Sequence, residues 1–242
     1  MIEAVIFDLD GTLVQTEKLK AISYARAAVE LCPDTLEEEE VIEAFREVVG
    51  RSRRYVAKTL VERFNLAEKA MIRAPDFGVT SPWQAYVQVR LAIYQEMIAE
   101  PQVIRQNQWP HNMALLAKSR DADCKIGLAT MSSCRQANRV LEALEQNSTF
   151  DFIATRDDVE RGKPDPEIYT LVAGELAVSP GQCLVIEDSV SGVQAALSAG
   201  MKVLAVSTPF TRDSLHKADL LPASLIVDDP GEVVKAALSI MK

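Results

Sequence analysis

The sequence has little of several features that mark particular classes of protein. Among its 242 residues, Lys and Arg together number 26 and Asp and Glu number 35, which gives a formal net charge of -9. An acidic chain is a poor partner for nucleic acid or for an anionic membrane surface. No apolar run approaches the ~18 residues that a membrane span requires. We therefore expect neither nucleic acid nor a membrane as a partner.

Cysteine and histidine are also scarce. The four cysteines show no Cys-x-x-Cys spacing, and His111 and His216, the two histidines, are not spaced as metal ligands. We interpret the cysteines as reduced thiols. The sequence opens on a strand-like run with no basic segment or cleavage site before it, so we expect no secretory signal. These absences together favour a cytoplasmic protein.

Short apolar runs recur along the chain, and amphipathic segments separate most of them. Such alternation predicts an α/β fold, a doubly wound parallel sheet with helices on both faces. Ligands of these sheets bind at the carboxyl ends of the strands. The predicted strands are 4–7, 125–129, 152–154, 184–186, 203–206 and 225–227.

One interval, residues 16–105, has helical patterning and no convincing strand. We expect it to form a helical cap domain, inserted into a core domain made of residues 1–15 and 106–242. A domain joined at two crossings permits hinge closure over a site in the core. Thr35 to Glu38 resembles a capping box. The predicted cap helices are 18–31, a helix from this capping box to Val49, 54–64 and 82–98.

Two carboxylates follow the first predicted strand. Strand side chains alternate, so Asp8 and Asp10 are expected to point to the same side where that strand ends. Such a pair repels and resists desolvation. A bound cation, or a proton held by one of the two carboxylates, lowers the free-energy cost of this repulsion and desolvation. Bound cations and protonated carboxyl groups are both used in the catalysis of phosphoryl transfer. The alternative is an ordinary turn and helix cap.

Four motifs in series resemble those of the haloacid dehalogenase superfamily. Asp8-Leu9-Asp10-Gly11-Thr12 is similar to motif I, Thr130 to motif II, Lys163 to motif III, and Glu187-Asp188 to motif IV. Each falls at a predicted strand end or in the following loop. The resemblance is greatest to members with a helical cap after motif I, which include small phosphatases and β-phosphoglucomutase. A chance match to one motif is common, and a chance match to all four in order is not.

The resemblance implies roles for these positions. Asp8 is the expected nucleophile, forming an aspartyl-phosphate, and Asp10 the expected general acid and base. Thr130 and Ser132 are expected to hold the transferred phosphoryl oxygens. Gly11 is expected to allow the tight turn at the site and to take part in substrate binding, and Thr12 to cap the segment after it. Lys163 is the expected charge neutraliser. The implied cofactor is Mg²⁺, with Asp8, Asp10 (through its backbone carbonyl), Asp188 and Glu187 as the expected ligands.

The cap carries a basic turn, Gly50-Arg51-Ser52-Arg53-Arg54. In mutase-like relatives a similar stretch grips the far phosphate of the substrate, and Arg53 is the matching position. Its planar guanidinium suits a second anionic group. The alternative is a solvated basic loop between helices.

Two positions depart from the mutase pattern. Lys20 replaces a cap-side His used in acid–base work, and Gln15 replaces an Asp. Both favour a phosphatase over a mutase. A dehalogenase or a phosphonate-cleaving enzyme would lack the carboxylate of Asp10, and the intact motif set argues against a non-catalytic binding module. We expect a Mg²⁺-dependent phosphomonoester hydrolase, a monomer or homodimer, acting on a small phosphorylated metabolite such as a phosphosugar. The alternative is a β-phosphoglucomutase-like mutase.

Overall fold

The computed structural model describes residues 1–49 and 52–241, and the chain divides into two compact units. The first unit combines Met1–Gln15 with Ile104–Lys242, and the second is Thr16–Val103. Within the first unit, the segments that lead into and out of the second are joined by backbone hydrogen bonds. Gln15 N–H donates to the Asn107 carbonyl at 2.7 Å, and Trp109 N–H donates to the Leu13 carbonyl at 2.8 Å.

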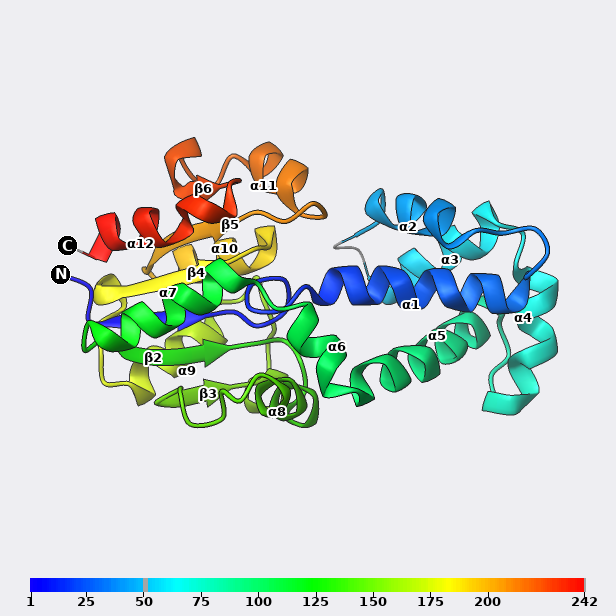
Figure 1. Ribbon diagram of the computed structural model, residues 1–242, viewed down its shortest axis with the longest axis horizontal. Helices are drawn as coiled ribbons and strands as arrows, with labels where there is room; N and C mark the ends of the chain where they lie inside the picture. The colour runs from blue at the N-terminus through cyan, green and yellow to red at the C-terminus, as the bar shows by residue number, and fades with distance from the viewer. Residues whose placement is uncertain (50–51, 242) are drawn as a thin grey trace. The chain divides into compact units, whose positions relative to one another are not determined.

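A parallel six-stranded sheet forms the centre of the first unit, in the order β3-β2-β1-β4-β5-β6 (Figure 1). This confirms the predicted fold class. Phe7, the last residue of β1, pairs with Leu128 of β2 and Ile186 of β4, so the carboxyl ends of these three strands lie side by side. The strands are β1 (Ala4–Phe7), β2 (Lys125–Ala129), β3 (Phe152–Ala154), β4 (Cys183–Glu187), β5 (Lys202–Val206) and β6 (Ile226–Val227).

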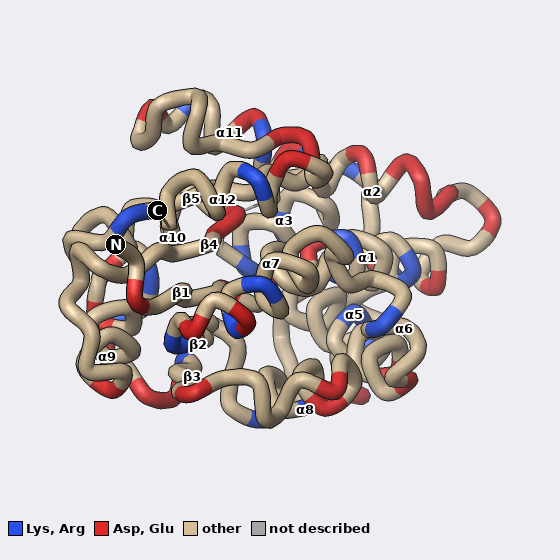
Figure 2. The backbone as a smooth tube through the Cα atoms, turned by 60° about the vertical axis from the view of Figure 1, so that its left-hand side comes forward, with Lys and Arg blue, Asp and Glu red and all other residues tan. Residues whose placement is uncertain are grey.

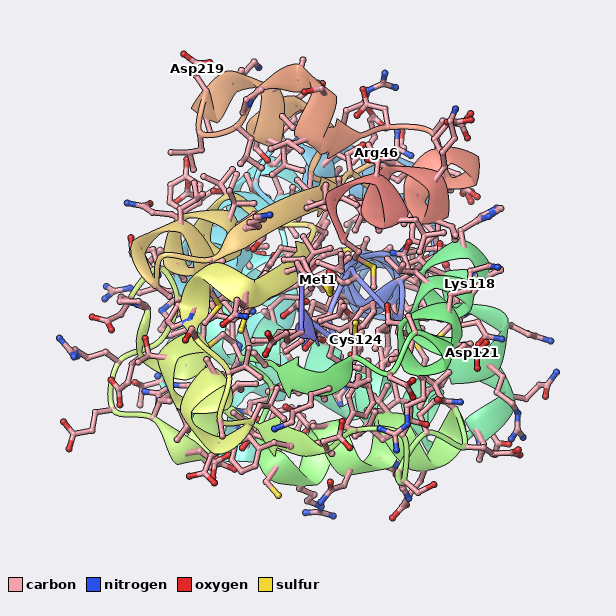
Figure 3. The ribbon with its side chains drawn as sticks, turned by 90° about the vertical axis from the view of Figure 1, so that its left-hand side faces the viewer. Met1, Arg46, Lys118, Asp121, Cys124 and Asp219 are labelled. Atoms are coloured by element: carbon pink, nitrogen blue, oxygen red, sulfur yellow. The ribbon has the colours of Figure 1, made fainter. Side chains whose placement is uncertain are left out.

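Helices cover both faces of this sheet. Every residue of β1 and β4 is buried, as expected of central strands covered on both sides. At the opposite end of β1, the Cys124 thiol donates to the Ile2 carbonyl at 3.9 Å, and Figure 3 places Cys124 in this part of the unit. The helices are α7 (Pro110–Asp121), α8 (Cys134–Ala143), α9 (Glu167–Glu175), α10 (Val190–Ser198), α11 (Arg212–Ala218) and α12 (Val233–Met241).

The second unit is helical over its described residues. Helices α1 and α5 pack together, and the Tyr86 hydroxyl of α5 donates to the Tyr24 carbonyl of α1 at 2.7 Å in the buried interface. The helices are α1 (Thr16–Leu31), α2 (Glu38–Arg46), α3 (Arg53–Arg63), α4 (Ala67–Arg73), α5 (Pro82–Ala99) and α6 (Pro101–Gln106), which runs across the boundary to the first unit.

Some predicted details of the helices are wrong. The capping box at Thr35 does not form, because Thr35 lies in a turn and α2 begins at Glu38 without a side-chain cap. Three glutamates in its first turn interact favourably with the helix dipole instead, and Figure 2 shows this acidic stretch in red. Helix α2 also ends at Arg46 rather than at Val49, and α4 and α6 were not predicted. No described helix is both long and apolar enough to span a membrane.

Candidate active site

Asp8 and Asp10 lie at the carboxyl end of β1, where they have different partners. Asp8 is 5% exposed, and its backbone N–H donates to the Ile186 carbonyl of β4 at 3.0 Å. Its Oδ1 accepts a hydrogen bond from Lys163 Nζ at 2.7 Å. Asp10 Oδ2 accepts from the hydroxyls of Thr130, at 3.0 Å, and Ser132, at 2.7 Å. The structure therefore brings residues of motifs I, II and III together at one strand end.

The hydroxyls of Thr130 and Ser132 are directed at Asp10. Thr130 Oγ1 also accepts the Ser132 backbone N–H at 3.0 Å. Neither residue belongs to a helix, because α8 begins at Cys134. Thr130 and Ser132 instead occupy the loop after β2, where their hydroxyls fix the orientation of the Asp10 carboxylate.

Gly11 makes the turn after Asp10 possible. Its φ of +93° lies in the region that disfavours residues with a side chain. A Cβ at this position would also overlap the carboxylate of Asp188. Asn112 of α7 stabilises the same turn, because its Nδ2 donates a hydrogen bond to the Thr12 carbonyl at 2.6 Å. The expectation that Thr12 caps the following segment is wrong, because its Oγ1 is buried without a hydrogen-bond partner.

Lys163 is a buried cation between two carboxylates. Its side chain is 4% exposed, and Nζ donates to Asp8 Oδ1 and Glu187 Oε1 at 2.7 Å each and to the Ala129 carbonyl at 3.0 Å. These three bonds match the three donors of an ammonium group. Burial alone would lower the pKa of Lys163, but Asp8 and Glu187 outweigh burial and hold that pKa well above its usual value. The lysine is therefore charged.

Glu187 is held by hydrogen bonds at both carboxylate oxygens. Oε1 accepts from Lys163 and from the Tyr169 hydroxyl at 3.0 Å. Oε2 accepts from the backbone N–H groups of Asp188 and Ser189 and from the Ser189 hydroxyl, at 2.8–2.9 Å. Glu187 therefore orients Lys163 in this structure. Its predicted role as a metal ligand stays a prediction.

Tyr169 is a site residue that the sequence analysis missed. It lies on α9 and is fully buried, with its ring centroid 4.9 Å from Lys163 Nζ and its hydroxyl on Glu187. From the sequence it is indistinguishable from the apolar core residues that share its face of α9. Only the placement of a buried carboxylate within reach of its hydroxyl reveals the contact.

The buried acids at these strand ends form a set that suits a hard divalent cation. Asp8, Glu187 and Asp188 each offer an oxygen, and these atoms lie within 4.8 Å of one another. Burial raises the pKa of Asp8 to about 7; Lys163 opposes this rise, whereas the negative charges of Glu187 and Asp10 add to it. A cation at this point would favour the ionised carboxylate. The donor set therefore fits Mg²⁺, which prefers carboxylate and carbonyl oxygens and retains water.

Arg53 lies in the second unit, as the first residue of α3. Ser52 caps this helix by accepting the Tyr55 N–H at 3.3 Å. Arg53 is exposed, and it lines a groove of about 460 Å³ between α3 and α5. Lys20 Nζ lies 2.6 Å from Glu17 Oε1 on α1. Gly50 and Arg51, the other part of the predicted basic turn, lie outside the described residues.

Comparisons with known proteins agree with this arrangement. A model of the haloacid dehalogenase-like hydrolase family matches residues 2–200. The chain is 31% identical over 200 residues to the phosphorylated carbohydrates phosphatase of Thermotoga maritima, covering 83% of this chain and 82% of that protein. It is 30% identical over 204 residues to the beta-phosphoglucomutase of Bacillus subtilis, with 84% and 83% covered. The solved beta-phosphoglucomutase of Clostridium difficile matches with a TM-score of 0.64 at 25% identity, covering 100% of both chains.

The parallel sheet covered by helices, with carboxylates and a buried lysine at its central strand ends, defines the class as a doubly wound α/β protein with a charged site at the carboxyl ends of its strands. The chain belongs to the haloacid dehalogenase-like hydrolase family.

Proposed function

We propose that this protein is a Mg²⁺-dependent phosphomonoester hydrolase whose nucleophile is Asp8 and whose substrate is a small phosphorylated metabolite, such as a phosphosugar. The observation that carries the proposal is the contact of the Asp8 carboxylate with the buried Lys163, 155 residues away in the sequence. A carboxylate held next to a fixed cation, with further acids beside it, is suited to attack phosphorus while the charge on the phosphoryl oxygens is neutralised.

In the first step an Asp8 oxygen bonds to phosphorus while the bond from phosphorus to the substrate oxygen breaks. Asp10 donates a proton to the departing alkoxide, so the alcohol leaves neutral. In the second step Asp10 takes a proton from water, which attacks the phosphorus of the aspartyl-phosphate. Inorganic phosphate leaves, and the Asp8 carboxylate is restored. Lys163 stays charged throughout and holds Asp8 in place.

Asp8, Asp188 and the Asp10 backbone carbonyl are the proposed Mg²⁺ ligands. The ion, when bound, would supply positive charge at the phosphoryl oxygens. Glu187 is proposed to act mainly through Lys163, because direct coordination would require it to give up hydrogen bonds that it makes in this structure. The helical second unit is proposed to be a cap whose residues select the substrate, Arg53 among them.

The role of Asp10 as acid gives the sharpest test of this mechanism. Replacing Asp10 by Asn should lower the first-turnover rate with an alkyl phosphate by about 10²–10⁴-fold. The first-turnover rate with 4-nitrophenyl phosphate should fall much less, because nitrophenolate leaves without a proton. Rapid-quench measurement of alcohol release in the first turnover separates this step from hydrolysis of the aspartyl-phosphate.

The matched control for Asp10→Asn is Asp219→Asn, an exposed position that already has a left-handed backbone with φ of 51°, which Asn tolerates. This control should leave both rates unchanged. If Asp10→Asn slowed the first turnover of both substrates by the same factor, Asp10 would not be the acid. If the unmutated protein released no phosphate from either ester with Mg²⁺ present, the proposed function itself would be wrong.

The similarity to beta-phosphoglucomutases supports a second candidate, a phosphosugar mutase. The two activities share every core residue named above and differ in whether water or a sugar hydroxyl receives the phosphoryl group. Lys20, paired with Glu17, supports the hydrolase. Incubation with β-glucose 1-phosphate decides between them: the hydrolase releases phosphate, whereas the mutase forms glucose 6-phosphate.

A further inference from the structure

The loop that carries Lys163 has no regular secondary structure. Residues 159–166 lie between a short 3₁₀ helix, Arg156–Asp158, and the start of α9. Lys163 Nζ nevertheless contacts Asp8 Oδ1 and Glu187 Oε1 at 2.7 Å each. Because a lysine side chain has several rotatable bonds, its ammonium group is fixed at low entropic cost only where its backbone is held in place. The contacts that hold this loop therefore control where the charge of Lys163 lies.

Arg156 holds this loop by its carbonyl groups. Its guanidinium donates to the Val159 carbonyl at 2.5 Å and to the Glu160 carbonyl at 3.3 Å. Hydrogen bonds from a charged donor are stronger than those between neutral groups. The two bonds satisfy backbone groups that lie outside any helix or strand and therefore need other partners. Arg156 thus fixes the path of the chain just before Lys163.

Glu167 holds the same loop by its N–H groups. It is the first residue of α9, and its two carboxylate oxygens accept the backbone N–H groups of Glu160 and Arg161, at 2.8 and 3.0 Å. These two bonds lower the pKa of Glu167, so its carboxylate is charged at neutral pH. The peptide groups of residues 159–161 are therefore held by a cation at their carbonyls and by an anion at their N–H groups.

The 3₁₀ helix that contains Arg156 also holds the loop after β2. The Arg156 N–H donates to the Ser132 carbonyl at 3.0 Å, and Asp157 Oδ2 accepts the first N–H of α8 at 2.8 Å. The Ser132 hydroxyl in turn donates to Asp10 Oδ2 at 2.7 Å. One short element therefore joins the loop that orients Asp10 to the loop that carries Lys163.

We propose that Arg156 and Glu167 are positioning residues, and that they act by holding the ammonium group of Lys163 against the Asp8 carboxylate. This inference rests on the proposed function, since it assigns both residues to the step in which Asp8 attacks phosphorus. Both act on the backbone of the loop, and their effect reaches the reacting atoms through Lys163. Neither residue had a functional interpretation in the sequence.

The first arm of the test measures initial rates of 4-nitrophenyl phosphate hydrolysis with Mg²⁺ present. Arg156→Ala and Glu167→Gln should each lower kcat by about tenfold, which corresponds to the loss of about one hydrogen bond to a charged group. Arg156→Lys, which keeps the charge and can donate to one carbonyl, should lose less. In the Lys163→Met background, Arg156→Ala should lower kcat by less than about twofold, because no ammonium group is left to position. A role in folding alone would cost the same factor in both backgrounds.

The second arm needs no enzyme activity. The metal-free, full-length protein is treated with a limiting amount of an acetylating reagent, and the rate at each lysine is measured by mass spectrometry. A buried, ion-paired ammonium group reacts slowly, because only the neutral amine is a nucleophile. Acetylation of Lys163 should be at least about tenfold faster in Arg156→Ala and in Glu167→Gln than in the unmutated protein. Acetylation of Lys202, at the exposed first position of β5, should not change.

Two exposed ion pairs of the same unit supply matched controls. Arg120→Ala removes a guanidinium that lies 3.0 Å from Asp151 Oδ1, and Glu232→Gln removes a carboxylate charge that lies 2.7 Å from Lys235 Nζ. Both controls should leave kcat and the acetylation rate of Lys163 unchanged.

An unchanged acetylation rate of Lys163 in both Arg156→Ala and Glu167→Gln would overturn the proposal, as would kcat values within about twofold of the controls. If near-UV circular dichroism shows that Arg156→Ala is unfolded, Glu167→Gln decides both arms. An unmutated protein that releases no phosphate would overturn the proposed function, whereas the acetylation rates would still test the placement of Lys163. An active enzyme without this effect and an inactive protein that shows it are therefore separate results.

Discussion

Asp8→Asn is expected to lower Mg²⁺-dependent phosphate release by at least about a thousandfold. An amide has no anionic oxygen with which to attack phosphorus, so the aspartyl-phosphate cannot form. Asn has a side chain of the same size and keeps one oxygen that can accept the hydrogen bond from Lys163 Nζ. In the unmutated protein this nitrogen lies 2.7 Å from Asp8 Oδ1. The loss should therefore appear in kcat, measured as phosphate released from 4-nitrophenyl phosphate. Turnover within tenfold of the unmutated protein would show that Asp8 is not the nucleophile.

The pH dependence of the stability of Asp8→Asn distinguishes a loss of catalysis from a loss of folded structure. The pKa of Asp8 is raised in the folded, metal-free protein to about 7 from an ordinary value of 3.8. The folded state therefore binds a proton more tightly than the unfolded chain, and metal-free stability should fall as pH rises from about 4 to above 7. The decrease in Tm as pH rises should therefore be smaller in metal-free Asp8→Asn than in the metal-free unmutated protein. Adding Mg²⁺ to the unmutated protein should also make this decrease smaller. Asp219→Asn, whose side chain projects from the surface after α11 (Figure 3), should keep the full dependence.

Lys163→Met has the second largest expected effect, because it removes the charge shared by Asp8 and Glu187. We expect kcat to fall at least about a hundredfold, since the nucleophile loses its fixed partner and the phosphoryl oxygens lose a cation. Unfolding free energy of the metal-free protein should also fall, by about 3–5 kcal/mol, since two buried carboxylates lose their counter-charge. Urea denaturation and initial rates measure the two effects.

The stability loss in Lys163→Met should be smaller at pH 5 than at pH 8, because protonation of Asp8 relieves the remaining repulsion. Lys202→Met, at the exposed first position of β5, is the matched control and should change neither rate nor stability appreciably. A Lys163→Met protein as active and as stable as this control would show that the buried ion pair has neither role.

The fold was predictable because its signals are local. Each strand is a short apolar run, and carboxylates directly after β1 and β4 had to lie at one edge of a parallel sheet. The approach of Lys163 to Asp8 has no local signal, and only the resemblance to a known family placed it there. The boundaries of α2, and the presence of α4 and α6, depended on tertiary packing that helix patterning does not record.

Side-chain partners were harder to predict than positions. The hydroxyls of Thr130 and Ser132 bond to Asp10, and whether they also hold a phosphoryl group stays a prediction, because the direction of each hydroxyl depends on loop geometry. Tyr169 was missed for a physical reason. It lies on α9 among apolar neighbours, and its role depends on the buried carboxylate of Glu187, which the fold brings within reach of its hydroxyl. Sequence spacing carries no record of that contact.

The covalent link between Asp8 and phosphorus is most directly tested by trapping it. Asp10→Asn, which lacks the base for the second step, is mixed with 4-nitrophenyl phosphate and Mg²⁺, quenched in acid during turnover and digested for mass spectrometry. The account predicts one added phosphoryl group on the peptide that contains Asp8, fragmenting at that residue and absent from Asp8→Asn. Phosphate on any other residue, or rapid turnover with no phosphorylated peptide at any quench time, would contradict it.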